Sequence, residues 1–296
     1  MSIVRLQIIQ RAFIKLSLLL LVSLAACSPA ADGRRIVSGQ SPQNDQIQKT
    51  KTIAVEEPQE TKVRISYSLA QTHVTLHEPV YLDFTIKNAM TKPVLVDLGA
   101  NRKEVFAFSF VTPDGSKSTA RPKRAEGSAM IGRIPLQPAQ SYSQKLLLNE
   151  WFDFPTPGQY EISVRLVKPE GSPRGFDIYD ISQSPQFRTT LLIQPRDAAL
   201  LKKICEMLEA QVFNARNDEE AIAPAEALSY INDPIAVPYL IKALYSRRSV
   251  EGFAITGLER IGTDEAVRGI ELAARSKNKD VAVFAKRALD RLGKSP

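Results

Sequence analysis

The sequence predicts two folded regions, an antiparallel β-sandwich over residues 61–195 followed by a helical solenoid over residues 197–296. Apolar residues recur at every second position up to Pro195 and with a period near 3.6 after it. In the later stretch a short apolar motif returns after 30 and then 31 residues, which indicates stacked helical repeats. A length of 296 residues also suits two domains of about 150 residues each.

The sandwich is predicted from runs in which alternate side chains share one apolar face. Turn-forming residues at 87–88, 112–115 and 156–158 separate the runs, so we expect seven or eight short strands. The apolar positions are Val63, Ile65, Tyr67 and Leu69; Val80, Leu82, Phe84 and Ile86; Phe106, Phe108 and Phe110; Leu146 and Leu148; Tyr160, Ile162, Val164 and Leu166; Phe187, Leu191 and Ile193.

Two segments of this region resemble immunoglobulin-like modules of bacterial surface proteins. One is LHEPVYLDFTIKN at residues 76–88, in which a Glu-Pro-Val step leads into an apolar strand that ends at Asn88. The other is Pro157-Gly158-Gln159-Tyr160 before an alternating strand. The resemblance implies an immunoglobulin-like sandwich in which the hydroxyl of Tyr160 bonds to nearby backbone.

The helical solenoid is predicted from the repeated motif and from capping residues. Asp233 before Pro234 suits a helix start, and Gly262 followed by Thr263 suits a stop and a new start. We expect helices at 197–213, 218–232, 234–246, 249–262, 264–275 and 279–292, as three helix pairs. The repeated residues are Ala227, Leu228 and Ile231; Gly257, Leu258 and Ile261; Ala288, Leu289 and Leu292.

The segments 236–240 (AVPYL) and 263–266 (TDEA) resemble HEAT-like repeats of the phycobilisome-lyase type. Members of this class mostly bind other proteins, so the resemblance implies a protein partner and no lyase activity. We expect contacts through helices 234–246 and 264–275. Because three repeats barely make a continuous core, we also expect the first helix pair to pack on the sandwich.

The N-terminus resembles the signal peptide of bacterial lipoproteins. Arg5, Arg11 and Lys15 precede a short apolar run, and Leu24-Ala25-Ala26-Cys27 matches the lipobox. The resemblance implies removal of residues 1–26 and attachment of diacylglycerol, usually with a further acyl chain such as palmitate, to Cys27. Two or more chains anchor a protein stably, and Ser28 after the cysteine favours the outer membrane, facing the periplasm.

Residues 27–60 follow as the acylated cysteine and a tether rich in Gln, Ser, Pro and charged residues. Such a composition cannot bury enough apolar surface to offset its ordering entropy, so we expect a disordered spacer. Acylation of Cys27 would leave Cys205 without a disulfide partner. Cys205 shares a helical face with Leu201, Ile204 and Leu208, where a thiol acts as a small apolar group.

The charge pattern argues against nucleic-acid binding. The net charge of +7 includes three positive charges of the signal peptide, and residues 197–296 hold equal numbers of acidic and basic residues. Arg121, Lys123, Arg124 and Arg133 lie in the segment 113–135, for which we expect a solvated loop, with anionic headgroups as a weaker alternative partner.

Candidate metal and catalytic residues are few. Two histidines and two cysteines exclude most zinc, haem and iron–sulfur sites, and we expect His73 and His77 to lie at the surface on either side of one short strand. No motif for a serine hydrolase, zinc protease, nucleotide or dinucleotide site occurs. The acidic pairs at 219–220 and 264–265 suit helix starts, and the pair at 56–57 lies in the tether.

The sequence therefore favours a non-catalytic, membrane-anchored lipoprotein of the cell envelope, without cofactor or metal, that acts as a protein-binding scaffold. Trp151, the single tryptophan, is expected in the core, with an exposed interface anchor as the alternative. Another hypothesis is a proteinase-inhibitor-like module acting through the sandwich loops 113–135 or 168–186. A further alternative is an enzyme with a site built on two carboxylates.

Overall fold

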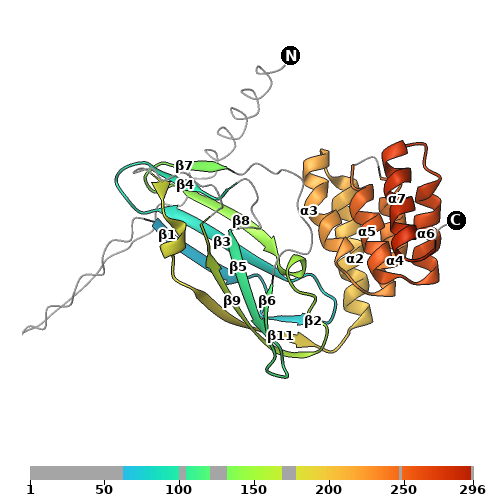
Figure 1. Ribbon diagram of the computed structural model, residues 1–296, viewed down its shortest axis with the longest axis horizontal. Helices are drawn as coiled ribbons and strands as arrows, with labels where there is room; N and C mark the ends of the chain where they lie inside the picture. The colour runs from blue at the N-terminus through green and yellow to red at the C-terminus, as the bar shows by residue number, and fades with distance from the viewer. Residues whose placement is uncertain (1–62, 100–104, 121–131, 169–177, 247–248, 295–296) are drawn as a thin grey trace, which may run out of the picture. The chain divides into compact units, whose positions relative to one another are not determined.

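The computed structural model describes residues 63–99, 105–120, 132–168, 178–246 and 249–294. Strands fill the first part of this range and helices the last part, as Figure 1 shows in blue to yellow and gold to red. The described residues form one compact unit. Residues 1–62, including Cys27 and the tether, lie outside the described range.

The described residues of the β-region, 63–194, form three sheets. One sheet has the order β1 (Val63–Leu69), β3 (Tyr81–Asn88), β8 (Ser141–Leu147). The largest has the order β2 (His73–Thr75), β11 (Phe187–Gln194), β9 (Gly158–Leu166), β5 (Phe106–Val111), β6 (Lys117–Ala120). The third has the order β10 (Ile178–Tyr179), β4 (Val94–Asp97), β7 (Arg133–Leu136).

The three sheets share one apolar core. Leu82, Phe84 and Ile86 of β3 are fully buried, and Phe84 meets Phe106 of β5 edge-on with ring centroids 5.0 Å apart. Leu136 of β7 joins the same cluster. The period-two faces expected from the sequence are therefore confirmed, since their residues form the core and their neighbours face outward.

The expectation of an antiparallel region with seven or eight strands needs correction. The described residues contain eleven strands, and two pairings are parallel: β10 with β4, and β2 with β11. The additional strands are two to four residues long, too short to show a period in the sequence. Of these, β6 lies within 113–135, which was expected to be a loop, and β7 begins in that segment at Arg133 and ends at Leu136.

The described residues of the helical region, 198–291, contain six α-helices. They are α2 (Ala198–Asn214), α3 (Asp218–Ser229), α4 (Val237–Ala243), α5 (Glu251–Ile261), α6 (Asp264–Ala274) and α7 (Lys279–Arg291). They follow the expected positions closely. The expected helix 234–246 differs, because Pro234–Ala236 forms a 3-10 turn before the shorter α4.

The helices stack in two rows. Helices α2, α4 and α6 contact one another in sequence, as do α3, α5 and α7, and each row packs against the other. The expected end signals are present: Asp233 accepts a hydrogen bond from the amide of Ile235, and Thr263 accepts one from Ala266. Gly262 ends α5 in the left-handed conformation at φ 65°.

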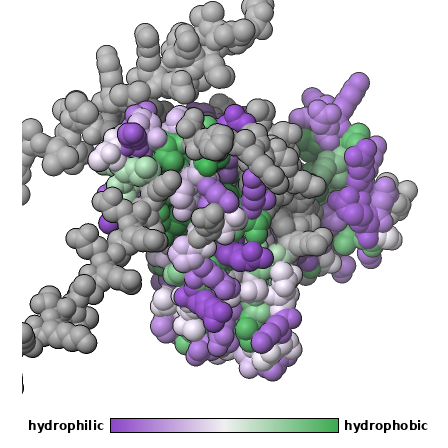
Figure 2. All heavy atoms as spheres, turned by 60° about the vertical axis from the view of Figure 1, so that its left-hand side comes forward, coloured by the Kyte–Doolittle hydropathy of each residue, from purple (hydrophilic) through white to green (hydrophobic). Residues whose placement is uncertain are grey.

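The surface of the described residues is mixed. Figure 2 shows hydrophobic residues in small separate groups among hydrophilic ones. Eight large apolar side chains are nevertheless exposed by at least a third: Leu192, Leu200, Met207, Phe213, Ile222, Tyr245, Leu272 and Val283. Two of these, Leu200 and Met207, line a cleft beside the β-region.

Candidate functional site: a cleft between the β-region and helix α2

The connector at residues 195–197 is bonded to both regions. The hydroxyl of Thr75 donates to the carbonyl of Pro195 at 2.9 Å and accepts from the amide of Asp197 at 2.7 Å. Arg196 pairs with Asp233, at the start of the turn before α4. Asp197 in turn caps α2 by accepting from the amide of Leu200. These bonds fix the direction in which α2 leaves the β-region.

Apolar contact supports the same junction. Tyr81 and Leu147 are cross-strand partners on β3 and β8, and both belong to the apolar cluster of the helical region. Their neighbours Leu82 and Leu146 point the other way, into the β-region core. At this end of β3 and β8, one face of the sheet therefore packs into the β-region core and the other face packs against the helical region. The expectation that the first helix pair packs on the β-region agrees with these contacts.

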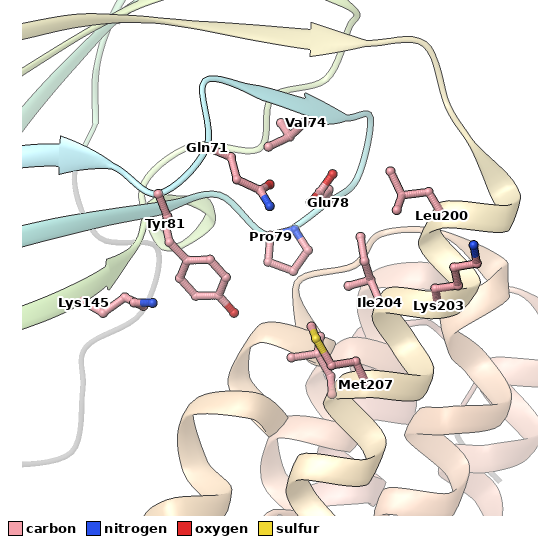
Figure 3. A pocket seen from close by; sticks show the side chains of 12 residues that line it. Gln71, Val74, Glu78, Pro79, Tyr81, Lys145, Leu200, Lys203, Ile204 and Met207 are labelled. Atoms are coloured by element: carbon pink, nitrogen blue, oxygen red, sulfur yellow. The ribbon is translucent and has the colours of Figure 1, made fainter.

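The cleft between the two regions has a volume of about 460 Å³. Its β-side is formed by Gln71, Val74 and the segment from Glu78 to Tyr81, and its helical side by α2. Figure 3 shows Tyr81 and Pro79 facing Ile204 and Met207 across the opening. The volume lies in the range of ligand-binding clefts, and most of the lining side chains are apolar.

Helix α2 presents two apolar stripes because its residues repeat every 3.6 positions. One stripe is buried and includes Leu201, Cys205 and Leu208. The other faces the cleft and consists of Leu200, Ile204 and Met207, of which Leu200 is 39% exposed and Met207 51% exposed. When a partner covers a large apolar side chain that is exposed in a cleft, the burial of its surface stabilises the complex.

Glu78 is the carboxylate in the cleft wall. It is buried and accepts a hydrogen bond from the amide of Thr75 at 2.9 Å. Burial raises the pKa of Glu78, and the backbone hydrogen bond partly opposes this shift. Burial also raises the pKa of Tyr81 to about 12, with Glu226 and Glu78 contributing, so that its phenol stays protonated.

Two lysines stand at the rim of the cleft. The ammonium of Lys145 lies 5.5 Å from the ring centroid of Tyr81 and 4.0 Å from the carboxylate of Asp83. Lys203 lies on α2 and has no ion pair within the described part of the chain. By contrast, the two glutamates of α2 are paired, Glu206 with Lys202 and Glu209 with Lys242.

His77 precedes Glu78 of the cleft wall and lies near the ion pair between Arg196 and Asp233. It adopts φ 74°, a left-handed conformation that is uncommon for residues other than glycine. Burial lowers its pKa, while Asp233 acts in the opposite direction and Arg196 in the same direction. His77 is half-buried and His73 is exposed, so both histidines reach the surface as expected, but His73 is the first residue of strand β2 and does not precede it.

A second hollow of about 650 Å³ lies on the outer face of β5, β6, β9 and β11. Its lining is rich in hydroxyl groups, and the hydroxyls of Ser109 and Ser163 lie 3.1 Å apart. Each of the two hollows contains one carboxylate, Glu78 in the cleft and Glu161 here. Neither brings together the two carboxylates that the enzyme alternative requires.

The residues singled out from the sequence take different places. Trp151 is in the β-region core, with its ring centroid 4.9 Å from Phe108, so the core interpretation is confirmed. Cys205 is fully buried, and burial raises its pKa to about 12. The acidic pairs 219–220 and 264–265 begin α3 and α6 as expected. The Arg121–Arg124 segment and residues 169–177 of the second inhibitor loop lie outside the described residues.

The sequence did not reveal the cleft. Leu200 and Met207 lie next to the buried stripe of α2, and from the sequence alone apolar residues at such positions are predicted to be part of the core. No helix in the described ranges is long and apolar enough to span a bilayer. Those ranges also contain no group of three or more His, Cys, Asp or Glu residues placed to hold a metal ion.

Comparisons with known proteins add little. No protein-family model and no curated protein matches the chain. A mutant β-glucosidase from Listeria innocua in complex with laminaribiose matches with a TM-score of 0.27 and 13% identity, over 45% of this chain and 16% of that one. The DNA glycosylase AlkC from Pseudomonas fluorescens bound to DNA matches with a TM-score of 0.26 and 12% identity, over 46% and 31%.

A third structure, the CARDB domain of the PF1109 protein from Pyrococcus furiosus in complex with di-metal ions, has a TM-score of 0.25 and 9% identity. It covers 46% of this chain and 94% of its own. The present chain thus spans about a sixth of the β-glucosidase.

Proposed function

We propose that this chain is a lipid-anchored protein of the bacterial cell envelope that binds another protein without catalysing a reaction. Cys27 carries the lipid, residues 28–60 provide reach, and the two folded regions provide the binding surface. The lipobox Leu24-Ala25-Ala26-Cys27 supports the anchor. The outer membrane, with the folded part in the periplasm, is the proposed location.

We further propose that the β-region is an immunoglobulin-like sandwich. The hydroxyl of Tyr160 donates to the carbonyl of Thr156 at 2.8 Å, which is the local bond that the Pro-Gly-x-Tyr resemblance implies. Asn88, at the end of the other resembling segment, is fully buried and donates to the carbonyls of Lys92 and Leu136. Asn88 thus joins the end of β3 to β7, whereas Tyr160 bonds within the turn that precedes its own strand.

The helical region is proposed to be a short HEAT-like solenoid. Ala236, Val237 and Leu240 of one repeat and Ala266, Val267 and Ile270 of the next are all buried, so equivalent positions have equivalent environments. The two rows of helices support the same interpretation. Solenoids of this kind offer extended surfaces to other proteins.

The observation that carries the binding function is the exposed stripe of α2 within the cleft. Leu200, Ile204 and Met207 lie across the cleft from Tyr81 and Pro79, and the connector before α2 is hydrogen-bonded to both regions. An open apolar cleft on rigid supports is typical of a docking site.

Site-specific photocrosslinking in intact cells tests this function. A photoreactive residue at Met207 is expected to capture a protein, and the same residue at Val283 serves as a matched control because it is also an exposed apolar helix position. Capture from position 207 is expected to fall in the Cys27→Ala variant, which would lack the anchor. Equal capture from both positions, or none from position 207, would contradict the proposal.

A further inference from the structure

We propose that the cleft accepts an amphipathic helix carrying carboxylates on its flanks, with apolar side chains spaced three and four residues apart. This inference rests on the proposed function and specifies the chemistry of its partner. It depends on three features of the cleft: the geometry of the α2 stripe, the occupied backbone groups of the opposite wall, and the sign of the charges at its rim.

The stripe of α2 matches a helix in length and spacing. Leu200, Ile204 and Met207 lie at positions i, i+4 and i+7, so they extend over roughly 10 Å, or two helical turns. A second helix laid along this stripe can place its own apolar residues between them. The long flexible side chain of Met207 adapts to the residues that it meets.

The opposite wall disfavours an extended peptide. A peptide that adds a strand needs free backbone groups on its host. Here the amide of Leu76 donates to Gln194, that of Glu78 to Thr75, and that of Val80 to the side chain of Asn149. Pro79 has no amide hydrogen. Recognition therefore falls to side chains, and a helix presents side chains alone because its own backbone groups are paired.

The charges at the rim favour a partner with carboxylates. The glutamates of α2 are neutralised by Lys202 and Lys242, and Glu78 is turned to the backbone of Thr75. Lys203 has no ion pair in the described ranges. Lys145 forms an exposed ion pair with Asp83 at 4.0 Å, so its ammonium can still meet a second carboxylate. The two lysines would attract acidic side chains on either side of an apolar stripe.

Peptide display on the full-length mature protein tests the inference. Random 16-residue peptides displayed on phage are selected on the immobilised protein and on two variants. Lys203→Glu combined with Lys145→Glu reverses the charge at the rim. Lys279→Glu combined with Lys286→Glu is the matched control, since both lysines are exposed on α7 and do not line the cleft.

The selection is expected to enrich acidic peptides with apolar residues three and four positions apart. Affinity for the selected peptides is expected to fall about tenfold or more in the rim variant and less than about twofold in the α7 control, since each rim pair contributes modestly. Enrichment of basic or proline-rich extended peptides, no enrichment, or equal loss in both variants would overturn the inference.

The two proposals fail independently. If crosslinking from position 207 captures a protein whose bound segment is basic or extended, the scaffold function stands and the acidic-helix inference falls. If acidic helical peptides are selected but no protein is captured in cells, the cleft chemistry stands and the proposed function falls.

Discussion

Arg196 and Asp233 form a forked ion pair that ties the connector to the helical region. The Nη2 of Arg196 lies 3.0 Å from one carboxylate oxygen of Asp233, and its Nε bonds to the other. Asp233 is only 2% exposed and also accepts from the amide of Ile235. The carboxylate of Asp233 thus caps the turn at Pro234–Ala236 and binds Arg196 of the connector. Thr75 of the β-region binds the same connector at Pro195 and Asp197.

Replacing Asp233 is expected to destabilise the fold. Asp233→Ala removes the cap and the partner of Arg196, and loss of the cap alone costs about 1–2 kcal/mol. Asp233→Asn retains an acceptor for Ile235 and is expected to lose less. Urea denaturation of both variants measures the free energy of unfolding. An unchanged value for Asp233→Ala would show that the pair does not hold the junction.

Stability is expected to depend on His77 at mildly acidic pH. Burial lowers the pKa of His77, so the unfolded chain, with a pKa of about 6.5, takes up the proton first. Its contribution to stability is thus present above pH 6.5 and lost as the pH falls below that value. Glu78 acts in the opposite direction because its pKa is raised in the folded state.

The His77→Asn variant isolates this effect. Asparagine tolerates the left-handed backbone at φ 74° and does not titrate. Denaturation measured between pH 7.5 and 5 is expected to show a smaller loss of stability for His77→Asn than for the wild type. His73→Asn, at an exposed strand position, is the control. Parallel curves for the wild type and His77→Asn would contradict the assignment.

Two glycines of α5 make a matched pair. A Cβ at Gly257 would lie 2.9 Å from two side-chain carbons of Leu240 and from the Cα of Ser229, where the backbone cannot move away easily. Gly257→Ala is therefore expected to cost about 1–3 kcal/mol. A Cβ at Gly252 would meet nothing within 4 Å, so Gly252→Ala is expected to gain about 0.5–1 kcal/mol.

Thermal or urea unfolding of the two glycine variants checks the close packing between the helix rows. Opposite signs for the two substitutions support it. A stabilising Gly257→Ala would mean that α5 stands farther from α4 and the end of α3 than these distances state.

Thiol titration reports on both cysteines. Cys205 is fully buried with a pKa raised to about 12, so it is expected not to react with a thiol reagent at pH 8 in the native protein. In 6 M guanidinium the mature protein is expected to show one reactive thiol, because Cys27 is proposed to be acylated. Two reactive thiols after denaturation, or one in the native state, would contradict this account.

Much of the fold could be predicted because long runs carry strong periods. The strands around Phe84, Phe108 and Ile162 show their buried face in every second residue, and the helix ends at Asp233 and Gly262 show their capping chemistry. The two-residue strand β10 and its parallel pairing with β4 leave no such signal, because pairing depends on distant backbone rather than on side-chain pattern.

The cleft could not be predicted for a related reason. Tyr81 and Leu147 occupy positions that alternate with core residues, so their sequence pattern does not show that a second core covers them. Leu200 and Met207 are apolar residues at helical spacing, which predicts burial unless the neighbouring surface is known. His77 reaches Asp233 and Arg196 only because β2 and the connector lie side by side.

Metabolic labelling with palmitate tests most directly the claim that the chain is a lipid-anchored module. Label is expected in the wild type and in Cys205→Ala, and none in Cys27→Ala. Sequencing of the mature protein is expected to find no free N-terminus upstream of residue 27. Undiminished labelling of Cys27→Ala, or a mature chain that begins at another residue, would contradict the account.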